Sequence, residues 1–248
     1  MPVICDHELW EILEMTDAAN DLVIYGSPVS PFARKAMAVC IEKGVEFDFE
    51  TVNIMPMPDW FKEISPMRRI PVLRDRSVAD EGEAGTIADS SAMCAYIERK
   101  HPDLSLYGTT AYGHGRALMI EEYADTVLAP AGGLGIFRPV FFSLLQGNEP
   151  DIEKARETWA NDMPGVLGYL NAQLEGKKFF VDDTLSIADI AVTTVLMQVA
   201  LVAEMPLDDY PALASHYEHM TARPSIAGPY AKADGFIRKA LPERVQLT

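Results

Sequence analysis

Residues 22–44 read LVIYGSPVSPFARKAMAVCIEKG, and this stretch carries the clearest local evidence for the fold. Its first four residues, 22–25, form a short apolar run bounded by glycine, serine and proline, which predicts a buried strand. Pro31 suits the first position of a helix and Gly44 suits the residue just past its end, so a helix is predicted over 31–43. A buried strand that leads straight into a helix predicts the first half of a βαβ unit.

Strand and helix signals continue to alternate after this stretch. Strands are expected at 47–52, 70–73 and 86–88, a short helix at 60–64, and a further helix at 91–100. The predicted order is therefore βαβ, a short helix, then ββα. This is a mixed α/β pattern whose first βαβ unit is parallel.

The second half of the chain has no strand signal. Helices are expected at about 112–128, 152–174, 187–203, 211–222 and 229–240, with a glycine-rich break at Gly132, Gly133 and Gly135. The predicted organisation is an N-terminal extension at 1–20, an α/β domain at 21–103, a linker at 104–111 and an all-α domain at 112–248. The apolar stretch at 187–203 is expected to be a buried core helix rather than a membrane span.

Composition restricts the possible partners. The chain has 37 acidic and 21 basic residues and a formal net charge of −16, which disfavours nucleic acid and anionic membranes as partners. Its three cysteines include no CxxC pair, so neither a disulfide scaffold nor a structural zinc site is expected. His216 and His219 are expected on a solvated helix face, and no metal site is predicted. An acidic first segment without a secretory pattern favours a cytoplasmic location.

Ser30 stands where the first strand meets the first helix. A serine at this position caps the helix, beside free backbone N–H groups and the positive end of the helix dipole. The same surroundings stabilise an anion such as a thiolate. The local sequence alone leaves both roles open, and Ser27 is a competing hydroxyl nearby.

Two further motifs lie at ends of predicted strands. Ile70 and Pro71 open the third strand, where a cis proline would turn the preceding backbone outward toward a peptide-like ligand. Asp89 and Ser90 start the helix at 91–100 and either cap it or bind charged groups of a ligand. The fourth motif, Ser186–Asp189, has capping-box spacing and is interpreted as structural.

Taken in order, YGSPVSPF at 25–32, IPVL at 70–73, DSSA at 89–92 and LSIAD at 185–189 resemble the cytosolic glutathione S-transferase family. The likeness is closest to its serine-type classes (tau, phi and zeta) and their bacterial relatives. It extends over residues 22–240. It implies a thioredoxin-like N-terminal domain that binds glutathione, followed by an all-helical C-terminal domain.

The resemblance also implies roles for individual residues. Ser30 matches the catalytic serine, and the glutathione-binding set comprises Ser30, Phe32, Arg69, Ile70, Pro71, Asp89 and Ser90. Within this set, Ile70 would pair with the cysteinyl part, Asp89 and Ser90 with the γ-glutamyl end, and Arg69 with the glycyl carboxylate. Serine in place of the cysteine of omega-class enzymes and glutaredoxins disfavours thiol exchange.

The second substrate would be an electrophilic, mostly apolar small molecule. Its expected site in the helical domain comprises Tyr112, Tyr123, Phe137 and Phe141. The resemblance implies glutathione as co-substrate, detoxification, and a homodimer. Glutathione-dependent peroxidase, isomerase or dehalogenase activity, or a non-catalytic binding protein, are the alternatives. One departure from the family pattern is the stretch 53–58, which has no Lys or Arg.

Overall fold

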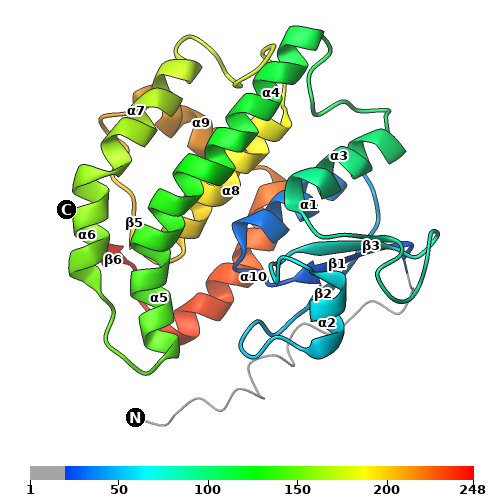
Figure 1. Ribbon diagram of the computed structural model, residues 1–248. Helices are drawn as coiled ribbons and strands as arrows, with labels where there is room; N and C mark the ends of the chain where they lie inside the picture. The colour runs from blue at the N-terminus through cyan, green and yellow to red at the C-terminus, as the bar shows by residue number, and fades with distance from the viewer. Residues whose placement is uncertain (1–19) are drawn as a thin grey trace. The chain divides into compact units, whose positions relative to one another are not determined.

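A computed structural model describes residues 20–248, so the expected extension at 1–20 lies outside the described residues except for its last position (Figure 1). The chain divides into two compact units. The first ends at His101 and the second spans Pro102–Thr248. Each unit has a hydrophobic core of its own.

The N-terminal unit is built on a four-stranded mixed sheet. Its strands are β1 (Leu22–Gly26), β2 (Asp48–Thr51), β3 (Val72–Asp75) and β4 (Thr86–Ile87). They lie in the order β2-β1-β3-β4, with β1 parallel to β2 and the other pairs antiparallel. This arrangement confirms the predicted strand order.

Helices α1 (Pro31–Glu42), α2 (Asp59–Ile64) and α3 (Ser90–Lys100) complete this unit. Alternate residues of β1, Val23 and Tyr25, pack with Phe61 and Ile64 of α2. Because side chains alternate across a strand, the residues between them face the other way, where α1 packs against both β1 and α3 (Figure 1). All five positions of β1 are buried, as expected of a strand covered on both faces.

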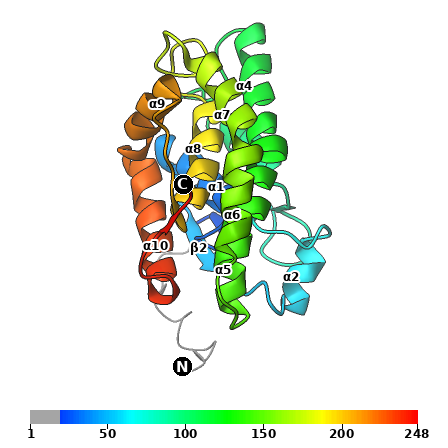
Figure 2. The same cartoon turned by 90° about the vertical axis from the view of Figure 1, so that its left-hand side faces the viewer.

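The C-terminal unit is mostly helical. One continuous helical run, Ala111–Leu145, comprises α4 (Ala111–Tyr123), two π-helical segments (Ala124–Leu128 and Pro130–Phe137) and α5 (Arg138–Leu145). The remaining helices are α6 (Ile152–Asn161), α7 (Met163–Leu174), α8 (Ile187–Ala200), α9 (Pro211–Thr221) and α10 (Pro224–Ala240). Helices α4 and α8 lie side by side (Figure 2). Twelve of the fourteen α8 residues are buried, which confirms α8 as the predicted core helix.

The glycine-rich segment does not break the helix, so that expectation was wrong. The chain continues through it as a π-helix, and the glycines instead permit close packing. A Cβ atom at Gly132 would lie 2.7 Å from Val199 of α8, and one at Gly135 would lie 2.4 Å from Thr158 of α6. The single helix expected at 152–174 is also divided, with α6 ending at Asn161 and α7 beginning at Met163.

The long helical run has the composition of a possible membrane span. Ala111–Leu145 is 35 residues long, with a mean hydropathy of 1.5 in its most apolar window, of which 39% is buried within the structure. It is the one such helix among residues 20–248. Core helices of globular proteins pass the same test of length and composition.

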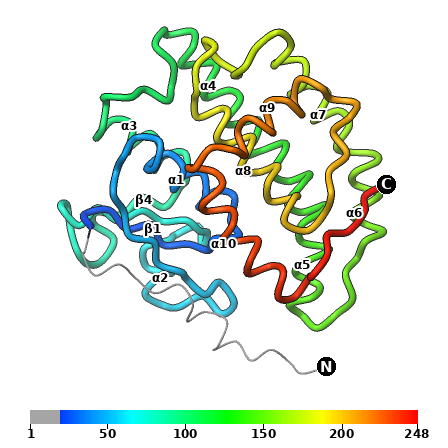
Figure 3. The backbone as a smooth tube through the Cα atoms, turned by 180° about the vertical axis from the view of Figure 1, so that it is seen from behind, coloured from blue at the N-terminus to red at the C-terminus, as the bar shows by residue number. Residues whose placement is uncertain are grey.

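The expectation of no strand beyond the linker was wrong for one small pair. Strands β5 (Ala203–Glu204) and β6 (Val245–Gln246) are parallel neighbours, and each is too short to give a periodic signal. The C-terminal segment passes close to α6 (Figure 3), where Arg156 Nε donates to the carbonyl of Gln246 at 2.9 Å.

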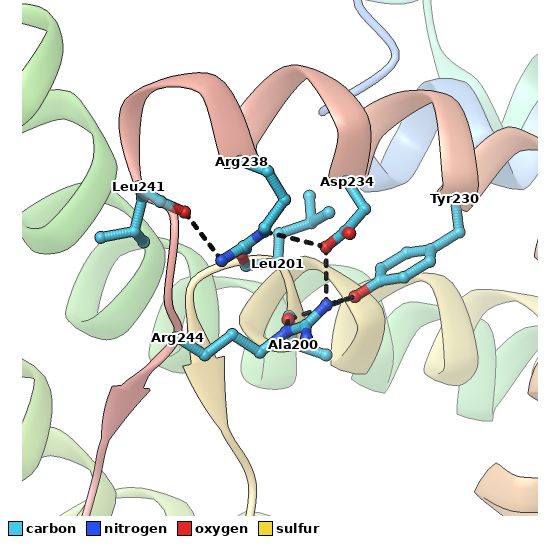
Figure 4. Close-up of polar contacts among 7 residues, drawn as sticks. All are labelled: Ala200, Leu201, Tyr230, Asp234, Arg238, Leu241 and Arg244. Carbon is cyan, nitrogen blue, oxygen red and sulfur yellow. Dashed lines mark hydrogen bonds and ion pairs between the residues drawn. The ribbon is translucent and has the colours of Figure 1, made fainter.

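Two arginines hold the end of α8 against α10 and the C-terminal segment (Figure 4). Arg244 Nε donates to the carbonyl of Ala200 at 2.5 Å, and Arg238 donates to the carbonyl of Leu201. Asp234 accepts from Arg244 at 2.6 Å and lies 3.3 Å from Arg238. These positive charges satisfy helix-terminal carbonyls and oppose the negative end of the helix dipole.

Candidate active site

Ser30 is the N-cap of α1, as predicted. Its backbone is extended, and its hydroxyl oxygen accepts a hydrogen bond from the Ala33 N–H at 3.3 Å. A hydroxyl has one donor and two acceptor positions, and this bond uses one acceptor position. Among the described residues, no hydrogen bond uses the Ser30 hydroxyl as donor. The side chain is therefore a cap whose proton is available to a ligand at the positive end of the helix.

The second motif lies beside the start of α1. The Ile70–Pro71 peptide bond is cis, as expected. Gly26, at the end of β1, fits between the two motifs, since a Cβ atom there would lie 3.2 Å from the Ala33 Cβ and 3.5 Å from the Pro71 Cβ. A glycine at this position therefore lets Pro71 approach the first turn of α1 closely.

Asp89 and Ser90 reach the same edge of the sheet. Leu73 pairs with Ile87 across β3 and β4, and continuing this register by two residues places Asp89 level with Pro71. Asp89 is the N-cap of α3, and its Oδ1 accepts from the Ala92 N–H at 2.9 Å. No hydrogen bond among the described residues uses Asp89 Oδ2 or the Ser90 hydroxyl. Two helix N-termini and the cis proline are therefore brought together at one edge.

Two buried cations of α1, which the sequence pattern did not indicate, also support this edge. Arg34 donates from a guanidinium nitrogen to the carbonyl of Pro28 at 3.0 Å, in the loop that carries Ser30. Lys35 Nζ donates to the Ser91 hydroxyl at 3.0 Å and so connects α1 with the first turn of α3. The available signal was a pair of adjacent cations near the start of a mostly apolar helix.

Arg69 lies in the loop before the cis proline, with an exposed side chain. No ion pair or hydrogen bond among the described residues occupies its guanidinium group, and the same holds for the exposed neighbour Arg68. The stretch 53–58 supplies no cation, and in it the Asn53 side chain accepts from the Met55 N–H at 2.8 Å. The cations that directly precede the cis Ile70–Pro71 bond are thus Arg68 and Arg69.

The cysteines of this unit that the structure describes offer no alternative nucleophile. Cys40 is fully buried in α1, and burial raises the pKa of its thiol to about 12. Cys94 of α3 is also buried. A thiol with such a pKa is protonated at neutral pH, so Cys40 is not a reactive thiolate.

The four residues expected at the second-substrate site do not converge. Tyr112 is 79% exposed, whereas Phe137 and Phe141 are buried core residues that contact each other at 5.5 Å between ring centroids. Tyr112 and Phe141 lie on one continuous helical run and are therefore separated by roughly 40 Å. Tyr123 is half-buried and packs against Tyr169 with ring centroids 4.4 Å apart.

The expectation of a solvated face was wrong for His216. This side chain is buried, and its Nε2 lies 2.9 Å from Asp189 Oδ1 at the start of α8. The burial of His216 could not be predicted from helical periodicity, because it results from the packing of α9 against α8. The part of the chain that the structure describes contains no group of three or more His, Cys, Asp or Glu side chains placed to hold a metal.

Comparison with known families gives two matches along the chain. The family model "Glutathione S-transferase, N-terminal domain" matches residues 29–100, and "Glutathione S-transferase, C-terminal domain" matches residues 136–233. The chain is 27% identical over 208 residues to the uncharacterized GST-like protein YibF of Escherichia coli, covering 82% of this chain and 96% of the relative. It is 25% identical to glutathione S-transferase omega-1 of Mus musculus over 99 residues, which cover 40% of this chain and 39% of the relative.

Solved structures show the same fold. A glutathione S-transferase from Rhodospirillum rubrum F11 superposes with a TM-score of 0.76 at 23% identity, covering 84% of this chain and 91% of that one. FzlA from C. crescentus gives 0.74 at 21% identity, covering 85% and 92%. The thioredoxin-like and helical domains predicted from the sequence are thereby confirmed. Because the two family models together span more than half of its length, the chain belongs to the glutathione S-transferase family.

Proposed function

We propose that the protein binds glutathione at the edge formed by Ser30, Pro71 and Asp89, and that Ser30 activates its thiol. The observation that carries this proposal is the unused hydroxyl proton of Ser30. The Ala33 N–H occupies only one acceptor position of the oxygen, so the hydroxyl can donate to a sulfur while it still caps α1. Bound thiolate would lie at the positive end of the helix dipole.

The remaining groups suit the rest of the tripeptide. The carbonyl and N–H of Ile70 would pair with the cysteinyl part. Asp89 Oδ2 would accept from the γ-glutamyl ammonium, and Ser90 would donate to its carboxylate at the N-terminus of α3. Arg69 would bind the glycyl carboxylate, and Phe32 would line the site beside the sulfur.

Magnitudes support activation without a metal ion or a general base. A free cysteine thiol has a pKa of about 8.5, and lowering it by about two units requires roughly 2.7 kcal/mol of differential stabilisation. A hydrogen bond to a charged acceptor contributes about 1.5–3 kcal/mol. The helix terminus adds about 0.3–1 kcal/mol. Ser30 and the dipole of α1 together therefore suffice.

The thiolate would attack an electrophilic, mostly apolar small molecule in a transferase reaction. For the second substrate we retain Tyr123 as the first candidate among the four residues, because it combines partial exposure with an aromatic neighbour. Burial raises the pKa of Tyr123, so its hydroxyl stays protonated and able to donate at neutral pH. A cytoplasmic location and a role in detoxification would accompany this activity.

The test is the ultraviolet absorbance of bound thiolate as a function of pH. Replacing Ser30 with Ala removes one charge-assisted hydrogen bond, so the thiol pKa of bound glutathione should rise by about 1–2 units. Ser27→Ala, which removes the competing hydroxyl, should leave that pKa unchanged. An unchanged pKa in Ser30→Ala would exclude Ser30 as the activating group. Absence of glutathione binding by the wild type would favour the non-catalytic binding protein.

We also propose a homodimer. The helical run Ala111–Leu145 exposes six large apolar side chains, among them Leu118, Val127 and Leu134, which favours contact with a second protein surface. Sedimentation equilibrium at micromolar concentration should give about twice the mass of the chain. A monomer at that concentration would contradict this proposal and leave the glutathione site unaffected.

A further inference from the structure

The turn between α2 and β3 is closed on a single buried residue, Ser65. The Ser65 hydroxyl donates to the carbonyl of Arg69 at 2.7 Å and accepts from the Arg69 N–H at 3.0 Å. The Arg68 N–H donates to the Ser65 carbonyl at 2.8 Å. One side chain thus fixes both backbone polar groups of Arg69, the residue directly before Ile70.

Burial makes these hydrogen bonds effective. Ser65 is 0% exposed, so water does not compete for its hydroxyl. Its own N–H donates to the carbonyl of Phe61 at 2.9 Å and so anchors it to the end of α2. The side chain of Arg69 is therefore exposed, while its backbone is fixed by a buried residue.

The backbone of this turn needs such support. Arg68 has φ +52°, in the left-handed region that residues other than glycine seldom occupy. A residue in that region is strained, and it persists where surrounding contacts determine its conformation. Ser65 supplies these contacts, because it is hydrogen-bonded to the N–H of Arg68 and to the backbone of Arg69.

We propose that Ser65 is a positioning residue that holds the Arg69 backbone so that its guanidinium group receives the glycyl carboxylate of glutathione. This inference rests on the proposed function and adds a source of selectivity to it. Ser65 would favour a thiol tripeptide that ends in a carboxylate over a shorter thiol that lacks the glycyl residue. Ile70 depends less on Ser65, because Pro71 beside it packs against Gly26 and Val72 begins the ladder of β3.

The experiment measures the dissociation constants of glutathione and of γ-glutamylcysteine, which lacks the glycyl residue, by calorimetry. Ser65→Ala should weaken glutathione binding about tenfold, which corresponds to the loss of about one net buried hydrogen bond. Binding of γ-glutamylcysteine should change by less than about twofold. Equal weakening of both ligands would overturn the inference, because Ser65 would then act on the whole site.

Further variants complete the test. Arg69→Met should likewise weaken the binding of glutathione more than that of γ-glutamylcysteine. Adding Ser65→Ala to Arg69→Met should cause no further loss of glutathione binding. An additive loss would overturn the inference. Ser77→Ala removes a hydroxyl from the loop at the opposite end of β3 and should affect neither ligand. If Ser65→Ala does not fold, Ser65→Cys, of similar size and weaker hydrogen bonding, should show the same preferential loss. Failure of the wild type to bind either thiol would refute the proposed function instead.

Discussion

Two of the helices that the structure describes, α1 and α8, have a serine as their N-cap residue, and the two serines have different surroundings. Ser30 caps α1 through one bond from the Ala33 N–H and is 8% exposed. Ser186 caps α8 and is 1% exposed, and both its N–H and its hydroxyl donate to Asp189 Oδ2 at 2.8 Å. The first serine retains a donor for a ligand, whereas the second has none to spare.

The residue at the third helical position accounts for the difference. In α8 this position is Asp189, which folds back on the cap and also accepts from the Phe180 N–H at 3.0 Å and contacts His216. In α1 it is Ala33, which has no polar side-chain atom. The helix α3 at the proposed γ-glutamyl site likewise has alanine, Ala92, at this position. In α1 and α3 the capping residue has no acidic partner three residues later, so its helix terminus can receive a ligand.

Removal of Asp189 should have the largest effect on the difference between the two caps. The Asp189→Ala variant leaves buried donors from Ser186, Phe180 and His216 without an acceptor, so unfolding should become easier by about 3–5 kcal/mol. Urea denaturation followed by circular dichroism measures this change. Ser30→Ala is the matched variant at the open cap and should cost about 1 kcal/mol or less. Comparable losses in the two variants would show that the caps do not differ as described.

Much of the fold could be predicted because its signals are local. The apolar run at 22–25, Pro31 and Gly44 locate β1 and α1 within a residue or two of their observed ends. The capping box at Ser186–Asp189 correctly predicted the start of a buried helix. Hydrogen bonding within a helix turn and the helix propensity of neighbours suffice for such predictions.

Features that depend on distant residues could not be predicted in the same way. Lys35 and Ser91 lie 56 positions apart in sequence, and only the packing of α1 against α3 brings them together. The role of Ser65 is local but was also not predictable, because it depends on a turn conformation with Arg68 in the left-handed region, for which an arginine gives no signal. The glycines at 132–135 indicated a break because sequence cannot show that α8 and α6 pack against them.

The N-terminal unit itself contains a buried carboxylate, Asp75, that contrasts with Ser30 in the same way. Asp75, at the end of β3 away from Pro71, accepts from the Tyr96 hydroxyl and the Ser77 hydroxyl at 2.5 Å each and from the Lys100 ammonium. Burial alone would raise the pKa of Asp75. The hydrogen bonds from Lys100, Ser77 and Tyr96 outweigh burial and lower the pKa to about 2. Like Asp189, this carboxylate is closed off from ligands.

Asp75 should therefore affect stability in a pH-dependent way and leave glutathione binding unchanged. A carboxylate with a lowered pKa stabilises the folded state above its ordinary pKa near 4, and this contribution is lost as the pH falls toward about 2. Asp75→Asn should lower the free energy of unfolding by about 2 kcal/mol at pH 7, and the difference from wild type should vanish near pH 2. Urea denaturation across this pH range measures it. A difference independent of pH would mean that Asp75 stabilises the unit through packing, and weaker glutathione binding at pH 7 would mean that the two ends of β3 are coupled.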